Sequence, residues 1–110
     1  MKEGARAFRL TIAGYETLME GEDMRASILT LAAGESVPWH YHTETTDAFV
    51  CLDGTVVVET RAPRAQHVLA AGQRCAVPPR TAHHVHGLEG TACQFLILQG
   101  VGEYDNVAVG

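Results

Sequence analysis

Glycine and proline punctuation constrains the fold of this chain more than any other feature of its sequence. Most of the 11 glycines and 4 prolines stand at short intervals between Gly14 and Gly100, and the segments between them are rich in Val, Ile, Leu, Thr and Phe. Many short β-like runs at this spacing favour a sandwich or barrel over alternating strands and helices. The predicted strands include residues 26–31, 47–52, 55–60 and 92–99.

Glycine pairs locate the turns between these strands. Asp53-Gly54 lies between two predicted strands, and because glycine tolerates a positive φ, we expect a hairpin at this position. Ala33-Gly34 and Ala71-Gly72 predict two further hairpin or corner turns, each followed by a segment that contains histidine. The sequence has no internal repeat and no linker, so we expect one domain over residues 1–110.

Charge and hydropathy exclude two classes of partner. Eight Lys and Arg against 13 Asp and Glu give a net charge of -5, without the basic stripe that binding to nucleic acid requires. No apolar run approaches the roughly 20 residues of a membrane-spanning helix, and no apolar core follows the charged N-terminal residues as in a secretory signal. We therefore expect a cytoplasmic protein that binds neither nucleic acid nor membranes.

The cysteines do not predict a disulfide framework. Cys51, Cys75 and Cys93 are an odd number, and none belongs to a CxxC pair. Disulfide-rich domains and thiolate zinc sites need paired, closer spacing. Because all three have apolar neighbours in the sequence, we expect buried free thiols in a reducing compartment.

Histidine is concentrated rather than dispersed. Five of the six histidines fall in two short windows, PWHYH (His40, His42) and TAHHVHG (His83, His84, His86). Residues i and i+2 of a strand share a face, so His40 and His42 present two imidazoles to one centre. A third ligand from another strand would complete a metal site, and imidazole suits several divalent transition metals. His67 is isolated and is expected at the surface.

The spacing around these histidines resembles both signature motifs of the cupin superfamily. The segment from Gly34 to Gly54 resembles the motif G-x5-H-x-H-x(3,4)-E-x6-G, and the segment from Gly72 to Gly87 resembles G-x5-P-x-G-x2-H-x3-N. The resemblance extends over about residues 26–98, and the gap between the motifs is as short as in small single-domain bacterial cupins. It implies an all-β fold, a double-stranded jelly-roll barrel with one divalent metal, and it favours a homodimer.

The resemblance also implies a ligand set, which is His40, His42, Asp47 and His83. Three imidazoles and one carboxylate leave one or two coordination positions open, as a catalytic or ligand-exchanging site requires. The metal is then Fe, Mn, Ni or Zn. Asp47 replaces the usual glutamate of the first motif, and Glu44 remains the alternative carboxylate because it would share the face of His42 in a straight strand.

The second motif departs from the family pattern at two positions. Arg80 replaces a glycine, so a residue with a side chain has to hold a strained turn. Its guanidinium is either solvated or reaches the barrel mouth, where it would bind an anion. Gly87 stands where the family often has asparagine. His84 and His86 alternate with His83, which predicts surface or interface positions unless a register shift lets one of them replace His83.

Strand alternation gives further expectations around the first motif. Asp47, Phe49 and Cys51 share a face and are expected to point into the barrel. Trp39 and Tyr41 point away from the metal face. They either anchor a contact between subunits, where large aromatics are enriched, or pack on the outer sheet.

The functional prediction follows from the family resemblance. It implies a metal-dependent enzyme that acts on a small molecule, of the dioxygenase, isomerase or lyase type. The alternative is a non-catalytic module that binds a metal or a metabolite. The sequence has neither a Walker-type phosphate loop nor a G-x-S-x-G elbow, which disfavours phosphate-loop enzymes and nucleophilic hydrolases.

Overall fold

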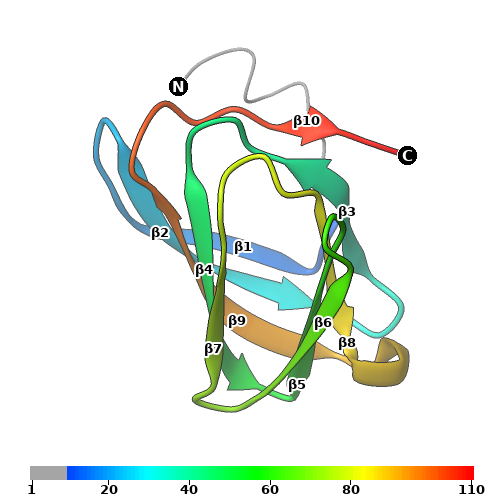
Figure 1. The fold of residues 1–110 in the computed structure, drawn as a ribbon. Helices are drawn as coiled ribbons and strands as arrows, with labels where there is room; N and C mark the ends of the chain where they lie inside the picture. Colours follow the sequence, from blue (N-terminus) through cyan, green and yellow to red (C-terminus); the bar gives the residue numbers. More distant parts are fainter. Residues whose placement is uncertain (1–9) are drawn as a thin grey trace.

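The computed structural model of the protein describes residues 10–110, which form two five-stranded antiparallel sheets. The sheets pack face to face as a jelly-roll sandwich (Figure 1), so the predicted all-β fold is confirmed. The helical content of the described residues is one short 3-10 turn, η1 (Leu88–Gly90), between two strands. No helix in this part of the chain is long and apolar enough to cross a membrane.

The two sheets divide the strands in an order that differs from the chain order. The first sheet runs β1 (Gly14–Glu20), β2 (Met24–Leu31), β9 (Cys93–Gly100), β4 (Thr46–Asp53) and β7 (Arg74–Val77). The second runs β10 (Val107–Ala108), β3 (Ser36–Tyr41), β8 (His83–Gly87), β5 (Thr55–Thr60) and β6 (Ala65–Ala70). The strands predicted from the sequence are β2, β4, β5 and β9, with ends displaced by no more than two residues.

The turn at Asp53-Gly54 is not the hairpin that the sequence predicts. β4 pairs with β7 and β9 in one sheet, whereas β5 pairs with β6 and β8 in the other. Gly54 has a φ of +72°, and a Cβ at this position would lie 2.6 Å from the carbonyl oxygen of Ala92. The glycine therefore makes the sharp turn possible, but the long-range pairing partners turn it into a corner between the sheets.

The other two predicted glycine turns are also corners. Gly34, between β2 and β3, has a φ of +84°, and Gly72, between β6 and β7, has a φ of +87°. In both cases the strands before and after the turn belong to different sheets. The corner at Gly34 leads into β3, whereas the one at Gly72 leads into β7 of the first sheet. The two histidine-containing segments lie side by side in the second sheet because β3 pairs with β8.

The core lies between the sheets and is built from alternating positions. Phe49 on β4 and Phe95 on β9 are both fully buried, with ring centroids 5.7 Å apart. Cys51 and Cys93 are buried and free, as predicted, while Cys75 is free but partly exposed. Burial raises the pKa of the Cys75 and Cys93 thiols to about 11, so both stay protonated near neutral pH. Phe49 and Cys51 point inward together with Asp47, as strand alternation predicts.

Candidate metal centre

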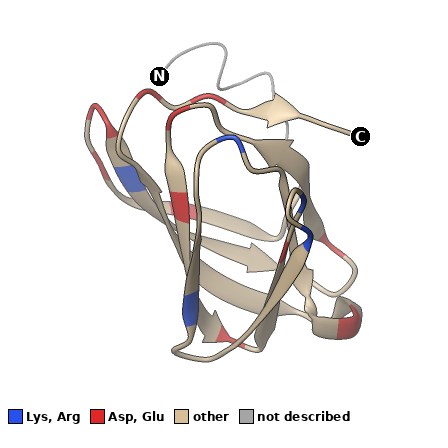
Figure 2. Ribbon diagram, in the orientation of Figure 1, with Lys and Arg blue, Asp and Glu red and all other residues tan. Residues whose placement is uncertain are grey.

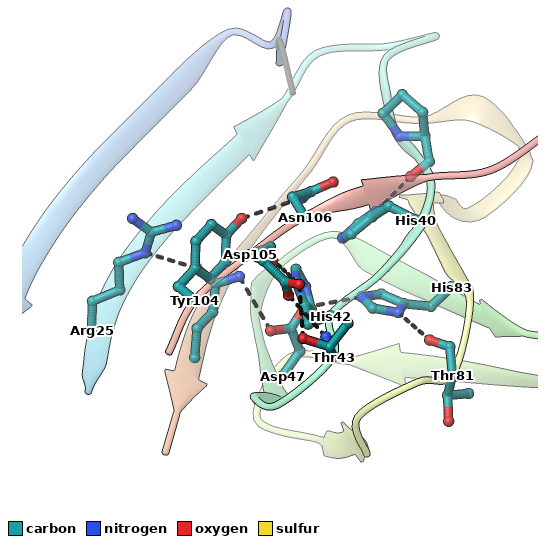
Figure 3. A network of polar contacts seen from close by, with 12 residues as sticks. Arg25, His40, His42, Thr43, Asp47, Thr81, His83, Tyr104, Asp105 and Asn106 are labelled. Carbon is teal, nitrogen blue, oxygen red and sulfur yellow. Dashed lines mark hydrogen bonds and ion pairs between the residues drawn. The ribbon is translucent and has the colours of Figure 1, made fainter. Parts of the chain in front are cut away.

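Four side chains that the family resemblance implies as metal ligands meet inside the sandwich (Figure 3). His40 comes from β3, His42 follows the end of β3, His83 begins β8 and Asp47 comes from β4 in the opposite sheet. Each is at most 3% exposed, and their candidate ligand atoms all lie within 4.8 Å of one another. The sheet register accounts for part of this meeting, because His40 is the pairing partner of His83.

Backbone carbonyls determine which nitrogen of each ring carries the proton. Each of the three imidazoles has its Nδ1 within 2.6–2.8 Å of a carbonyl oxygen, and since that oxygen can only accept, Nδ1 donates. Nε2 is then the lone-pair nitrogen of the neutral ring, the state that a metal ligand needs. The three pairs are His40 with Pro38, His42 with Asp105 and His83 with Thr81.

Asp47 lies between two of these rings. Its Oδ2 is 2.9 Å from Nε2 of His42 and 3.0 Å from Nε2 of His83. Its Oδ1 accepts a hydrogen bond of 3.2 Å from the side-chain amide of Gln99, which fixes the plane of the carboxylate. If both rings were neutral, Oδ2 would face two nitrogen lone pairs, so this arrangement requires a cation there, either a proton or a metal.

The pKa shifts agree with this requirement. Burial would raise the pKa of Asp47, but its hydrogen bonds to His42 and His83 outweigh burial and hold the pKa well below its usual range. Burial likewise opposes a charge on His42, yet the bond to Asp47 prevails and the pKa of His42 is raised. Burial, with the neighbouring His83, lowers the pKa of His40 to about 4. The centre thus combines an ionised carboxylate, a neutral imidazole and a protonatable one.

This donor set fits a divalent transition metal. Three borderline imidazole nitrogens suit Fe, Ni and Zn, and the hard carboxylate oxygen also suits Mn. The carbonyls behind the rings supply the outer hydrogen bonds that such sites use. A bound metal would take the place of the protons held between Asp47 and its neighbours. The residues that would hold it are His40, His42, Asp47 and His83.

Glu44, the alternative carboxylate, lies outside this group. Its side chain is exposed, and its Oε1 accepts a hydrogen bond of 3.1 Å from the backbone N–H of Glu103. Arg80 adopts a left-handed backbone conformation, with a φ of +61°. This strained turn is the one predicted for a residue that replaces the glycine of the second motif. Its backbone N–H donates to the carbonyl oxygen of His42 at 2.7 Å, while its side chain is exposed. Arg80 thus supports the centre through its backbone.

The histidines predicted on the opposite face are found there. His84 and His86 are partly exposed, while His83 and Val85 are buried, so neither of the two takes the place of His83. The ring of His84 stacks on that of Trp39, with 5.4 Å between centroids. Trp39 therefore packs on the outer sheet, which favours one of the two expectations for this residue. Its role in a contact between subunits stays a prediction.

The sequence interpretation missed the segment that follows β9. In residues 101–106, Tyr104 packs against His42 with ring centroids 5.2 Å apart, and the Arg25 guanidinium lies 4.1 Å from the Tyr104 ring centroid. The carbonyl of Asp105 accepts from His42, while its carboxylate accepts two bonds of 2.8 Å from Thr43. Figure 3 shows Tyr104 and Asp105 of this segment beside His42.

Among the residues near the centre that the sequence interpretation missed, Gln99 is the one with a signal in the sequence. Gln99 is a polar residue at an inward position of β9, in phase with the buried Phe95 and Ile97. A buried polar side chain on an apolar face needs a partner, and that partner is Asp47. Tyr104 and Asp105 lie outside both motifs, and no pattern in the chain connects them with the histidines.

Two cavities have Gln99 and Tyr104 in common among their lining residues. The inner cavity has a volume of about 40 Å³ and lies beside His40 and Asp47, with mostly apolar walls. The outer pocket is much larger, about 830 Å³, and Gln99 and Tyr104 line both. Acidic residues gather around the outer pocket, along the β1–β2 turn and the segment after β9 (Figure 2). They are Glu20, Glu22, Asp23 and Glu103.

The fold and the buried ligand set define a cupin with a candidate metal centre. The family model of the Cupin_2 domain matches residues 27–99, which is more than half of the chain. The protein therefore belongs to the cupin domain family Cupin_2, as its two motifs indicate. The comparison with curated proteins found no match.

Solved structures show the same fold at low sequence identity. The chain is similar to the Schizosaccharomyces pombe Cnp3 cupin domain (TM-score 0.70, 16% identity), with 79% of this chain and 63% of that one covered. It is also similar to a cupin-2 domain protein from Shewanella frigidimarina (TM-score 0.67, 18% identity), with 86% and 87% covered. An oxalate oxidase structure matches with a TM-score of 0.70 and 17% identity, and this chain covers 46% of its length.

Proposed function

We propose that the protein is a metal-dependent enzyme that acts on a small molecule, of the dioxygenase, isomerase or lyase type. The observation that carries the proposal is the buried group of three imidazoles and one carboxylate, whose ring tautomers are already set for a metal. Four protein ligands leave room for a small molecule at the metal. A divalent metal held there would supply Lewis-acid polarisation of that molecule.

The chain's own residues prepare the centre for this role. Gln99 holds the Asp47 carboxylate through Oδ1, and Arg25 in turn donates from Nε to Oε1 of Gln99 at 3.0 Å. This row of hydrogen bonds orients the carboxylate from the side of the outer pocket. Tyr104 packs against His42 and Arg25 and lines the inner cavity. A substrate would enter from the outer pocket past Tyr104 and Gln99.

The charge around the outer pocket restricts the substrate class. Four acidic side chains line it, with Arg25 as the one basic residue among its lining residues. Such a surface repels dianions and favours neutral or cationic molecules, because like charges raise the free energy of the bound state. We infer a small neutral or cationic substrate.

A second candidate function is a non-catalytic metal-binding module. The inner cavity favours it, since a volume of about 40 Å³ holds a few water molecules and is far smaller than an organic substrate requires. In this reading Tyr104 and the segment around it close the centre permanently. The two candidates differ in whether an added molecule can reach the metal.

Metal binding itself is tested by elemental analysis of the purified protein and of two variants, His42→Ala and Asp47→Ala. We expect the variants to lose the metal of the buried centre, while His67→Ala, at a histidine outside the group, keeps it. Circular dichroism of each variant checks that the fold is retained. A wild-type protein that takes up no added Fe²⁺, Mn²⁺, Ni²⁺ or Zn²⁺ would contradict the proposal.

The choice between enzyme and closed module needs a small probe of the metal. We suggest azide added to the Co²⁺-loaded protein, followed through the visible absorption of the cobalt. A change in the absorption that is absent from His42→Ala indicates an accessible coordination position, as the enzyme requires. An azide response that is the same in wild type and His42→Ala would favour the closed module.

We also propose that the protein acts as a homodimer. β1 is an edge strand, and within residues 10–110 it pairs on one side only, with β2. Leu18 and Met19 on this strand are 51% and 76% exposed. A second copy pairing β1 against β1 would satisfy the backbone groups of that edge and cover these side chains, and such a contact is self-complementary.

A further inference from the structure

A second group of ligand-type side chains lies on the outer face of the sheet that carries the buried histidines. His84 and His86 belong to β8 and Glu59 to the neighbouring strand β5, where Glu59 is the pairing partner of His84. Residues i and i+2 share a face, and the neighbour opposite completes a triangle. The candidate ligand atoms of the three residues lie within 4.8 Å of one another.

The contacts inside this group resemble those of the buried centre. Nε2 of His86 is 2.5 Å from Oε2 of Glu59, and its Nδ1 is 2.8 Å from the carbonyl oxygen of Gly87. Since that carbonyl can only accept, Nδ1 carries a proton, and the contact between Nε2 and the carboxylate requires a cation between them, either a proton or a metal. Nδ1 of His84 is 3.8 Å from the same oxygen. The group therefore gathers three candidate ligand atoms around one point.

We propose that Glu59, His84 and His86 form a second metal site that binds one divalent transition ion of borderline softness, such as Zn²⁺ or Cu²⁺. Two imidazoles and a carboxylate are the ligands that these ions prefer. The three side chains are 23–29% exposed, so a hydrated ion reaches them from solvent and keeps water in its remaining positions. The site is distinct from the buried centre, because its residues point to the opposite face of the sheet.

The residues next to this group affect how tightly it binds an ion, and one of them provides a fluorescence probe of binding. The ring of Trp39 stacks on that of His84, and the Arg61 guanidinium lies 3.9 Å from the centroid of the Trp39 ring. The positive charge of Arg61 opposes a bound cation, and the site is partly exposed, so we expect weaker binding than at the buried centre. Trp39 is the single tryptophan of the chain, and its fluorescence reports on an ion held by His84.

The test is a titration of the full-length protein with Cu²⁺, followed through Trp39 fluorescence, together with the number of Zn²⁺ ions bound at saturation. We expect saturable quenching and two Zn²⁺ per chain. His86→Gln and Glu59→Gln each raise the Cu²⁺ concentration at half-quenching by at least about tenfold and reduce the Zn²⁺ number to one. His67→Gln is the matched control on the same sheet and leaves both readouts unchanged.

A variant of the buried centre serves as the second control. His42→Ala removes one Zn²⁺ but keeps the Cu²⁺ quenching of Trp39, so a failure of the buried site and a failure of this site give different results. Thermal unfolding of His86→Gln and Glu59→Gln verifies that they fold. Quenching that is the same in wild type, His86→Gln and Glu59→Gln, or a Zn²⁺ number that these two variants leave unchanged, would overturn the proposal.

Discussion

A backbone carbonyl behind each inward histidine decides how that residue can act. The carbonyls of Pro38, Thr81 and Asp105 hold the proton on Nδ1, which directs the lone pair of each ring through Nε2. An imidazole with the opposite tautomer would present an N–H to a metal and could not bind it. Hydrogen bonds to neutral backbone carbonyls therefore prepare the three side chains to bind a metal.

The burial of His40 predicts a pH dependence of stability in the metal-free protein. Its pKa is about 4 in the folded chain and near 6.5 in the unfolded chain, which therefore binds more protons between these values. The free energy of unfolding falls as the pH drops from 6.5 to 4, by up to about 3 kcal/mol. Urea unfolding of the metal-free protein across this range measures the effect. His40→Asn is expected to flatten the dependence, and an equal slope in both proteins would refute it.

The left-handed turn at Arg80 predicts an unusual response to substitution. Glycine accepts a φ of +61° without strain, whereas a β-branched side chain does not. Arg80→Gly should leave stability within about 1 kcal/mol of wild type, because relief of strain offsets the greater freedom of the unfolded chain. Arg80→Val should lose about 1–2 kcal/mol. Chemical denaturation compares the two, and a more stable valine variant would contradict the account.

The structure brings together the four residues that the family resemblance implies as ligands. The motif spacing selected Asp47 over Glu44, and the structure places Asp47 with the histidines and Glu44 on the surface. It could not identify Tyr104 or Asp105, because their contact with His42 depends on how the chain returns after β9, which no local pattern encodes. That these residues bind a metal stays a prediction.

The pairing of the strands brings together residues that are far apart in the chain. β3 and β8 pair in one sheet, and β4 faces them from the other, so His40, His83 and Asp47 come together although they are separated in the chain. Local turn chemistry did not predict this arrangement. The sequence at Asp53-Gly54 predicts a hairpin, but a positive φ at glycine suits hairpins and sheet corners equally. Only the distant pairing partners, β9 for β4 and β8 for β5, distinguish the two.

The segment after β9 predicts a link between the C-terminal residues and the centre. The Asp105 carboxylate accepts two bonds from Thr43, which hold its carbonyl on His42. Asp105→Ala should cost about 1–3 kcal/mol of stability and speed the release of the buried metal, because the support of His42 weakens. Loss of metal to a chelator, followed with time, measures the release. Asp53→Ala, at an exposed turn, is the control, and equal rates in both variants would count against the link.

At the scale of the whole molecule, the exposed edge of β1 predicts self-association. Pairing through this strand should give a dimer in solution, which light scattering coupled to size-exclusion chromatography detects. Met19→Lys introduces a charge into the contact and like-charge repulsion between the two copies, so we expect mostly monomer. Val68→Lys, on β6 in the other sheet and 49% exposed, is the matched control. A monomeric wild type, or a dimer insensitive to Met19→Lys, would contradict this prediction.

The central claim is that one metal ion sits among His40, His42, Asp47 and His83. Anomalous diffraction from crystals of the metal-loaded protein tests it most directly, because it reports the element and its ligands together. The account predicts a peak about 2.0–2.2 Å from the three Nε2 atoms and one Asp47 oxygen. Crystals loaded with Zn²⁺ or Mn²⁺ that show no peak at this position, or a peak bound through other atoms, would contradict it.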